Sequence, residues 1–294
     1  MIALVGSFWG VIIALLFDQP IGLIQDNWLI TPIAFVAAAF ANATAIGGGF
    51  LFVPLFVFVY QLNPIAALKL SLATQAFGMT SGALGWSREF IVIKALPIAV
   101  VASILGMFFG TYYVPITGSL VKTSFAWVSL FIFGVIVIEI RYGKASNRIT
   151  LPTTGRLKSV MFFLACFVGG LVTAWTAIGI GEVVALYLLF IYRVRIDSAI
   201  GTGVAVLAFN SLVGLFFHIH LGGIPWEYLI FTAPGVIIGG YFGANIGRRL
   251  ESRGNTVSSL DYPIVKRKIS PLKLLFASVI LVDCVVMLAQ TYVL

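Results

Sequence analysis

Runs of about 20 apolar residues recur along the whole chain and are separated by short polar links. A run of this length spans the ~30 Å hydrocarbon core of a bilayer as an α-helix. The apolar segments are 1–17, 28–46, 50–62, 65–86, 91–113, 120–140, 159–178, 182–192, 197–219, 226–247 and 273–293. The pattern therefore predicts an all-α, polytopic membrane protein.

Glycines interrupt two of these apolar regions. Segments 28–46 and 50–62 are separated by the cluster at residues 47–49, and segments 159–178 and 182–192 by residues 179–181. At ~1.5 Å per residue the second leg of each pair covers about 17–20 Å, which is short of the hydrocarbon core. Each pair therefore predicts a helical hairpin that turns at its glycines and returns to the same side. Short, tilted full spans remain the alternative.

The basic residues orient this arrangement. If both pairs are hairpins, every other segment crosses once and the N-terminus is inside, then 16 of the 18 Lys and Arg residues lie on the inner side. These are Arg88, Lys94, Arg141, Lys144, Arg148, Arg156, Lys158, Arg193, Arg195, Arg248, Arg249, Arg253, Lys266, Arg267, Lys268 and Lys273. Lys and Arg collect on the cytoplasmic side of membrane proteins. The asymmetry predicts a multi-pass membrane protein with a cytoplasmic N-terminus, and we expect it in the prokaryotic inner membrane.

The two glycine-interrupted regions resemble each other. TAIGGGFLFVPLFVFVY (44–60) aligns without gaps with TAIGIGEVVALYLLFIY (176–192), with identity at 7 of 17 positions, and the same offset pairs Gly82 with Gly214. A sustained register of this kind predicts an internal duplication. In the charge-derived topology the first hairpin enters from outside and the second from inside. The repeats are therefore expected to have inverted topology, with a substrate site where their broken helices meet.

The expected organisation leaves no room for a separate soluble domain. Charged residues make up 10% of the chain and the mean hydropathy is +1.09, whereas soluble domains carry about a quarter charged residues. We expect an N-terminal transmembrane helix and outer loop (1–27), a first repeat (28–140), a cytoplasmic linker (141–158) and a second repeat (159–294). The net charge of +8 is explained by this topology and not by nucleic-acid binding.

The glycines at the two predicted hairpin tips are candidates for substrate binding. A glycine turn exposes backbone N–H groups, and a helix that begins there adds the positive end of its dipole. Together these groups bind an oxyanion without a charged side chain; close packing of helices is the alternative role for small residues. The candidates are Gly47, Gly48, Gly49, Gly179 and Gly181.

Two ionisable residues, Glu182 and Lys69, lie inside predicted apolar segments. Glu182 directly follows the second glycine cluster, where the first copy has Phe50. An acid inside a membrane is costly and is a functional candidate by default. Glu182 could carry a proton and couple it to anion binding, or could be an ordinary acid at a helix N-terminus. Lys69 could attract the anion, pair with Glu182, or extend to the interface.

Polar residues on neighbouring helices complete the candidate shell. Ser71 and Gln75 share one face of segment 65–86, and Asn210 lies on the matching segment 197–219. Such a polar face lines a cavity or makes interhelical hydrogen bonds. Gln75 and Asn210 are the preferred substrate donors. The approach to the two turns adds Asn42, Thr44, Trp175 and Thr176.

The repeated motif resembles that of a known family. TAIGGGFLFVP followed by IAALKLSLATQAFGMTSGAL, and TAIGIGEVVALYLLF followed by IDSAIGTGVAVLAFNSLVGL, are similar to the TauE/SafE sulfite exporter family, also called the transmembrane sulfonate/sulfite uptake family. The resemblance covers nearly the whole chain and implies transport of sulfite, organosulfonates or related organic anions. Glu182, the acid in GIGE, departs from the pattern of many members. The resemblance therefore does not identify the substrate.

These observations predict a secondary transporter of small anions that works by alternating access and is coupled to protons through Glu182. An uncoupled channel or facilitator on the same scaffold is the alternative, and its transport would be independent of a pH gradient. The sequence contains no GxGD pair, HExxH motif or P-loop, so neither an enzyme nor an ATP-driven pump is expected. No cofactor or metal is expected. The partners are a small anion, protons and the lipid bilayer, and the oligomeric state is left open.

Overall fold

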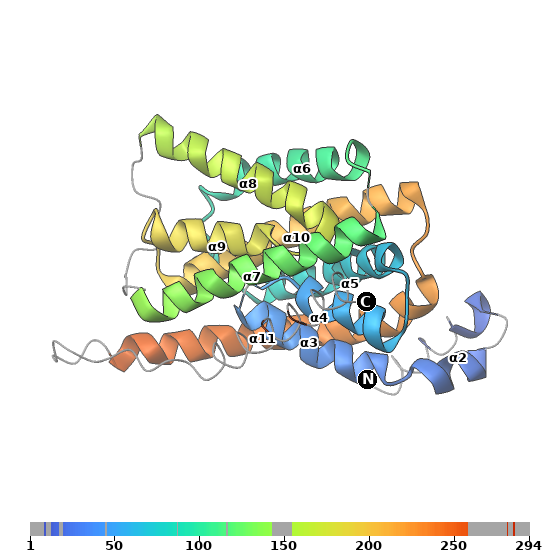
Figure 1. Cartoon of the computed structure of the whole chain (residues 1–294). Helices are drawn as coiled ribbons and strands as arrows, with labels where there is room; N and C mark the ends of the chain where they lie inside the picture. The colour runs from blue at the N-terminus through green and yellow to red at the C-terminus, as the bar shows by residue number, and fades with distance from the viewer. Residues whose placement is uncertain are drawn as a thin grey trace.

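The structure is a computed structural model that describes residues 9, 13–17, 20–44, 46–86, 88–115, 117–142 and 155–257, together with Leu281 and Val285. Over these residues every regular element is helical, as the apolar pattern predicts. The elements are α2 (Pro20–Asn27), α3 (Ile30–Thr44), α4 (Gly49–Pro54), the π-helical turn η1 (Leu55–Val59), α5 (Pro64–Gly85), the 3-10 turn η2 (Arg88–Phe90), α6 (Leu96–Tyr112), α7 (Gly118–Tyr142), α8 (Arg156–Thr176), α9 (Ile180–Phe190), α10 (Ile196–Leu221) and α11 (Trp226–Val257). Most of these helices run side by side along one direction (Figure 1).

Several of the helices are suited to cross a membrane. By length and composition α8, α10 and Trp226–Arg249 of α11 qualify singly. Helices α2 and α3 qualify together as a pair bent by 48°, which makes up to four candidate spans among the described residues. The protein is therefore a multi-pass membrane protein. Most of the predicted first segment, 1–17, and nearly all of the last, 273–293, lie outside the described residues.

Three helix boundaries differ from the sequence expectation. Residues Pro20–Asn27, predicted as part of an outer loop, form α2. Helix α6 begins at Leu96, and residues 91–95 before it form no helix. Pro97 occupies the first turn of α6, where the N–H that proline lacks would have no partner within the helix. Helix α11 continues to Val257, well into the polar tract that follows the apolar segment.

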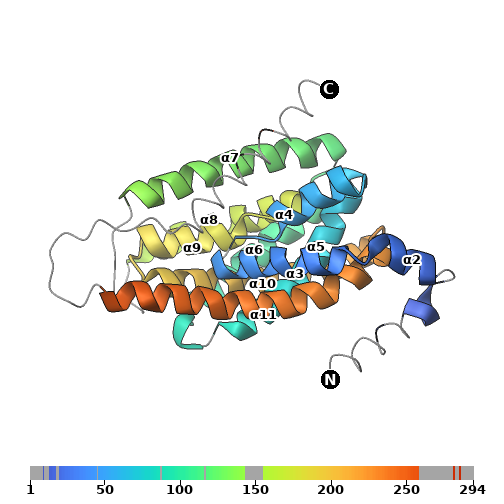
Figure 2. The same ribbon diagram turned by 90° about the horizontal axis from the view of Figure 1, so that it is seen from below.

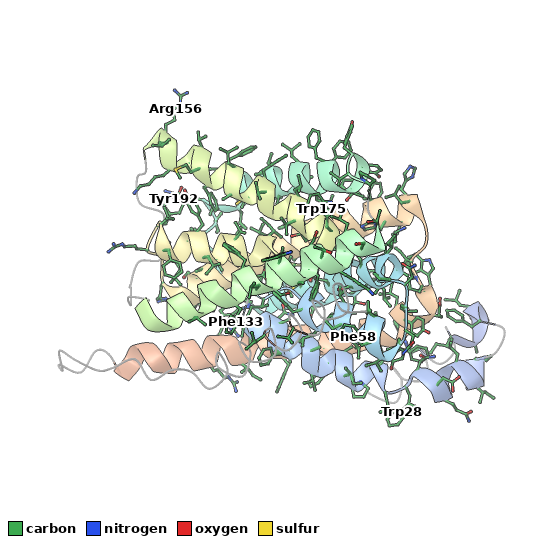
Figure 3. All side chains as sticks on the ribbon, in the orientation of Figure 1. Trp28, Phe58, Phe133, Arg156, Trp175 and Tyr192 are labelled. Carbon is green, nitrogen blue, oxygen red and sulfur yellow. The ribbon has the colours of Figure 1, made fainter. Side chains whose placement is uncertain are left out.

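The first glycine-interrupted region changes helix type at Pro54. Helix α4 ends at this proline and the chain continues as the π-helical turn η1. Proline lacks an N–H donor and its ring crowds the preceding turn, so the regular hydrogen-bond ladder stops there. Tyr60, just after η1, packs against a cluster of Ile13, Phe231 and Ile30, the first residue of α3. Figure 3 accordingly shows Trp28 and Phe58 toward the same end of the molecule.

The second glycine-interrupted region turns back on itself. Helix α8 ends at Ala177 in the left-handed conformation (φ 57°), and Gly179 (φ 128°) directly precedes α9. The Tyr192 hydroxyl, just after α9, donates to the Lys158 carbonyl near the start of α8 at 3.3 Å. Arg156 and Tyr192 therefore lie at one end, opposite to Trp28 and Phe58 (Figure 3).

Glycines bring α11 directly against the backbone of α3. A Cβ at Gly235, Gly239 or Gly243 would lie only 1.9–2.2 Å from the carbonyl oxygens of Thr31, Phe35 and Ala39 respectively. Glycines at four-residue spacing let membrane helices approach this closely, so that van der Waals contacts join them. Helices α6 and α8 pack in the same way, since a Cβ at Gly106 would lie 2.0 Å from the Phe167 carbonyl oxygen.

Helices α5 and α10 pass through the centre of the bundle, and α7 lies at its edge. Asn63 caps α5 by accepting from the Ile65 N–H at 2.9 Å, with Pro64 as the first helical residue. Long stretches of α5 and α10 are buried. Figure 2 shows α7 as the outermost helix on one side, alongside α8 and α9.

Candidate functional site

The two glycine turns meet in the interior of the protein. A Cβ at Gly49 would lie 2.6 Å from the carbonyl oxygen of Ala177, and one at Gly47 would lie 3.2 Å from the same atom. Glycine is therefore required here because the backbone of one turn lies directly against the other. The two turns come from segments 130 residues apart in sequence, so tertiary packing alone brings them together.

The Glu182 carboxylate bridges the two turns. Its Oε1 accepts a hydrogen bond from the Gly47 N–H at 2.6 Å, and its Oε2 accepts one from the Gly179 N–H at 3.0 Å. Glu182 is the third residue of α9, so its second contact is that of an acid folding back to the N-cap amide. The first contact crosses between the two regions. The N–H groups that sequence analysis assigned to an anion thus hold the protein's own carboxylate.

Glu182 is buried, and no cation among the residues that the structure describes lies beside it. Glu182 is 4% exposed, and its carboxylate accepts hydrogen bonds from backbone amides. The Lys69 ammonium donates instead to the Gly222 carbonyl at 2.7 Å, at the end of α10. The suggested ion pair between Lys69 and Glu182 is therefore wrong. Lys69 is half-buried, and its long side chain reaches toward the helix end as snorkelling predicts.

Gln75 supports the first turn from α5. Its Oε1 accepts from the Gly49 N–H at 3.2 Å, while its Nε2 donates to the Ser211 hydroxyl on α10 at 2.8 Å. Gln75 and Ser211 are both almost completely buried. A buried amide held at both ends has a fixed orientation. Gln75 is therefore the polar side chain of α5 that the structure brings to the glycine turns.

Two threonines of α8 shape the second turn. The Thr173 hydroxyl accepts from the Ile180 N–H at 3.0 Å and lies within donor distance of the Gly169 carbonyl, at 2.7 Å. The Thr176 hydroxyl lies 2.8 Å from the Ile178 carbonyl oxygen. These hydroxyls satisfy backbone groups that the helix break leaves unpaired. Sequence analysis selected Thr176 but missed Thr173 and Ser211; the spacing of Thr173 and Thr176 before the break was the available signal for the former.

The remaining predicted residues make contacts away from the turns. The Asn210 amide donates to the Ser103 carbonyl of α6 at 3.0 Å, and the Trp175 indole donates to the Gly110 carbonyl at 3.1 Å. The Thr44 hydroxyl donates within its own helix, to the Phe40 carbonyl at 3.1 Å. These three groups are interhelical or intrahelical donors in this conformation.

Asn42 and Ser71 carry buried oxygen atoms without a hydrogen-bond partner in this structure. The Asn42 amide nitrogen donates to the Ala38 carbonyl at 2.9 Å, while its Oδ1 has no partner. That oxygen occupies the space above Gly82, because a Cβ at Gly82 would lie 1.6 Å from it. The Ser71 hydroxyl is fully buried and also has no partner. Buried acceptors of this kind are available to water or to a ligand.

A cavity adjoins the turn on the side of α7. It has a volume of about 300 Å³ and lies between α7, α8 and α9. Glu182 and Gly179 form part of its wall, and the other lining residues are Trp127, Val128, Phe131, Val168, Gly169, Val172, Val183 and Leu186. Glu182 is the single ionisable residue among these. In the described part of the chain, no group of three or more His, Cys, Asp or Glu side chains is arranged to hold a metal ion.

Comparison with known proteins places the chain among membrane transporters. The family model described as Sulfite exporter TauE/SafE matches residues 30–256, which include both glycine turns, Gln75 and Glu182. A relative from Bacillus subtilis (strain 168), named "Probable membrane transporter protein YunE", is 22% identical over 250 residues, which are 76% of this chain and 90% of the relative. No solved structure matches the chain.

Proposed function

Because the chain belongs to the sulfite exporter TauE/SafE family, we propose that it is a secondary transporter of small sulfur-containing anions, such as sulfite or organosulfonates. The substrate oxyanion binds at the two glycine turns. The observation that carries this proposal is the bridging carboxylate: the N–H groups of Gly47 and Gly179 already hold the two oxygens of one anionic group. A sulfonate or sulfite presents oxygens of the same kind to the same donors.

The surrounding groups favour an anion over a cation at this position. The Gly47 and Gly179 amides both point at the Glu182 carboxylate, and the 11-residue α9 begins at Ile180 with its positive end there. Gln75 holds the Gly49 amide in place, and Asn42 and Ser71 supply further polar atoms for the larger substrate shell. A cation would meet the N–H groups with the wrong sign and would have to rely on Glu182 alone.

Glu182 couples the anion to a proton. While ionised, its carboxylate occupies the Gly47 and Gly179 amides and repels a second anion. Once protonated, it loses its charge and holds these amides less strongly, so the substrate oxyanion can replace it. Substrate and proton therefore bind together, which is the thermodynamic requirement of a symport.

Alternating access follows from two inverted repeats whose broken helices meet at the site. Arrangements of this kind rock one repeat or helix bundle against the other around a fixed site. The glycine contacts of α3 with α11 and of α6 with α8 each join a helix of the first repeat to a helix of the second, so the units that move are expected to be bundles built from both repeats. The protein resides in the prokaryotic inner membrane with its N-terminus in the cytoplasm, in line with the placement of Lys and Arg.

The direct experiment is a binding screen by thermal unfolding of the purified full-length protein. Sulfite, thiosulfate and methanesulfonate should raise the unfolding temperature in a saturable manner, since a ligand that binds the native state stabilises it. Dimethyl sulfone is the matched neutral control for methanesulfonate and should leave the temperature unchanged. Stabilisation by neutral or cationic solutes, with none by any anion, would overturn the proposal.

A further inference from the structure

The cavity between α7 and the α8–α9 pair places a carboxyl group next to an almost wholly apolar space. Glu182 is its one ionisable lining residue, and the opposite wall consists of aromatic and aliphatic side chains of α7, among them Trp127 and Phe131. A volume of about 300 Å³ lies at the lower end of the range for small-molecule sites in proteins. The cavity therefore has the size and lining to admit a compact apolar molecule as far as Glu182.

The rim of this cavity faces the hydrocarbon of the bilayer. Trp127 and Phe131 of α7 are 56% and 66% exposed, and Val168 of α8 is 56% exposed. These residues lie near the middle of their helices, α7 from Gly118 to Tyr142 and α8 from Arg156 to Thr176. Exposed apolar side chains in the middle of a membrane helix contact lipid tails and not water. A molecule dissolved in the hydrocarbon reaches this rim directly, whereas a hydrophilic molecule does not.

We propose that Glu182 is a lipid-accessible carboxyl group, and that the cavity is a binding and modification site for compact, uncharged, lipophilic molecules that react with carboxylic acids. Hydrophobic carbodiimides are the chemical class that fits. They dissolve in hydrocarbon, and they require a carboxyl group that is protonated at least part of the time. This proposal concerns the side of the site that faces lipid, and it holds whatever solute the protein carries.

The reaction conserves every atom of both partners. The protonated Glu182 carboxyl gives its proton to one nitrogen of the carbodiimide, and its oxygen bonds to the central carbon as one C=N double bond becomes a single bond. The product is an O-acylisourea, with no leaving group and no change in oxidation. Water, which would hydrolyse this product, is scarce in the apolar cavity. The acyl group therefore moves from oxygen to nitrogen and leaves a stable N-acylurea on Glu182.

The test compares two carbodiimides on the full-length protein in liposomes. N,N′-dicyclohexylcarbodiimide is lipophilic, whereas 1-ethyl-3-(3-dimethylaminopropyl)carbodiimide is cationic and water-soluble. Peptide mapping by mass spectrometry should find the lipophilic reagent on Glu182, with labelling at least tenfold greater than with the soluble reagent. Labelling should increase as the pH falls, because only the protonated carboxyl reacts. Equal labelling by both reagents, or none by the lipophilic one, overturns the proposal.

Two matched variants test the route. Val168→Trp fills the rim of the cavity, whereas Leu164→Trp places the same side chain one turn earlier on α8, at a residue of 55% exposure that does not line the cavity. Val168→Trp should reduce labelling of Glu182 several-fold, and Leu164→Trp should leave it unchanged. If both variants label like the wild type, the route through the cavity is wrong. Because labelling requires no substrate, failure of the anion-binding screen would leave this result intact, and the reverse also holds.

Discussion

The Glu182 carboxylate, on α9, accepts a hydrogen bond of 2.6 Å from the backbone N–H of Gly47, in the turn that precedes α4. This bond joins the two glycine-interrupted regions, and a second bond to the Gly179 amide completes the bridge. The same contact gives Glu182 two roles. It stabilises the meeting of the turns, and it occupies the amides that we assign to the substrate.

Removing the charge of Glu182 should abolish the pH dependence of anion binding. In the wild type, binding should strengthen as the pH falls, because protonation removes the carboxylate that competes for the two amides. Glu182→Gln is uncharged at every pH, so its affinity should be nearly constant over the same range. Titration with methanesulfonate, which stays a monoanion throughout, checks this without a change in the ligand. A parallel pH profile in both proteins would disprove a role for Glu182.

Truncation of Glu182 should open the site to external carboxylates. Glu182→Ala leaves the buried Gly47 and Gly179 amides without an acceptor, which costs about 1–3 kcal/mol of stability for each amide left unpaired. Acetate or formate should restore part of the lost unfolding temperature in this variant and have little effect on the wild type. Chloride at equal ionic strength is the control. Equal responses of the two proteins to acetate would mean that the amides are not an oxyanion site.

Gln75 should matter for anion binding as well as for folding, because its loss leaves the buried Gly49 amide without an acceptor. Gln75→Leu removes the acceptor of the Gly49 amide while preserving most of the volume, so we expect at least a tenfold loss of anion affinity, equivalent to ~1.4 kcal/mol. Gln75→Glu retains an acceptor for Gly49 and tests whether a second negative charge excludes the substrate. Both variants are measured by anion titration beside thermal unfolding. If Gln75→Leu binds anions as the wild type does, α5 has no part in the site.

Gly179 should tolerate no side chain. Its φ of 128° is disfavoured for any residue with a Cβ, and that atom would also lie 3.3 Å from Val172 Cγ1. Gly179→Ala should therefore lower the free energy of unfolding by about 1–3 kcal/mol. Gly22→Ala, in α2 with open space around it, is the control and should be neutral or slightly stabilising. Equal stabilities of the two variants, measured by denaturant unfolding, would show that the turn is not under this constraint.

The contact between α3 and α11 should depend on its glycines. Gly239→Val would drive a Cβ to within 2.2 Å of the Phe35 carbonyl oxygen, so α11 must move away from α3. We expect a large loss of folded protein, because overpacking of a tight interface costs typically 1–3 kcal/mol or more. Gly134→Val on α7, where nothing lies within 4 Å, should fold normally. Fluorescence-detected size-exclusion profiles and thermal unfolding distinguish the two outcomes.

Local pattern was sufficient to predict much of this architecture. Apolar runs located the helices, and the glycine clusters located both turns, because a break in a membrane helix has few other causes. The contact of Glu182 with Gly47 was not predictable from either segment alone, since it depends on the packing of two regions 135 residues apart. The role of Lys69 was left open for the same reason. Of the alternatives considered, pairing with Glu182 does not occur, and its side chain extends to the Gly222 carbonyl at the helix end.

The most direct measurement of the central claim is anion uptake into proteoliposomes under an imposed pH gradient. With the outside more acidic, wild-type protein should accumulate radiolabelled sulfite or methanesulfonate above equilibrium, and a protonophore should abolish the accumulation. Glu182→Gln should equilibrate the anion without responding to the gradient. Wild-type uptake that ignores the pH gradient, or accumulation that survives in Glu182→Gln, would contradict the account.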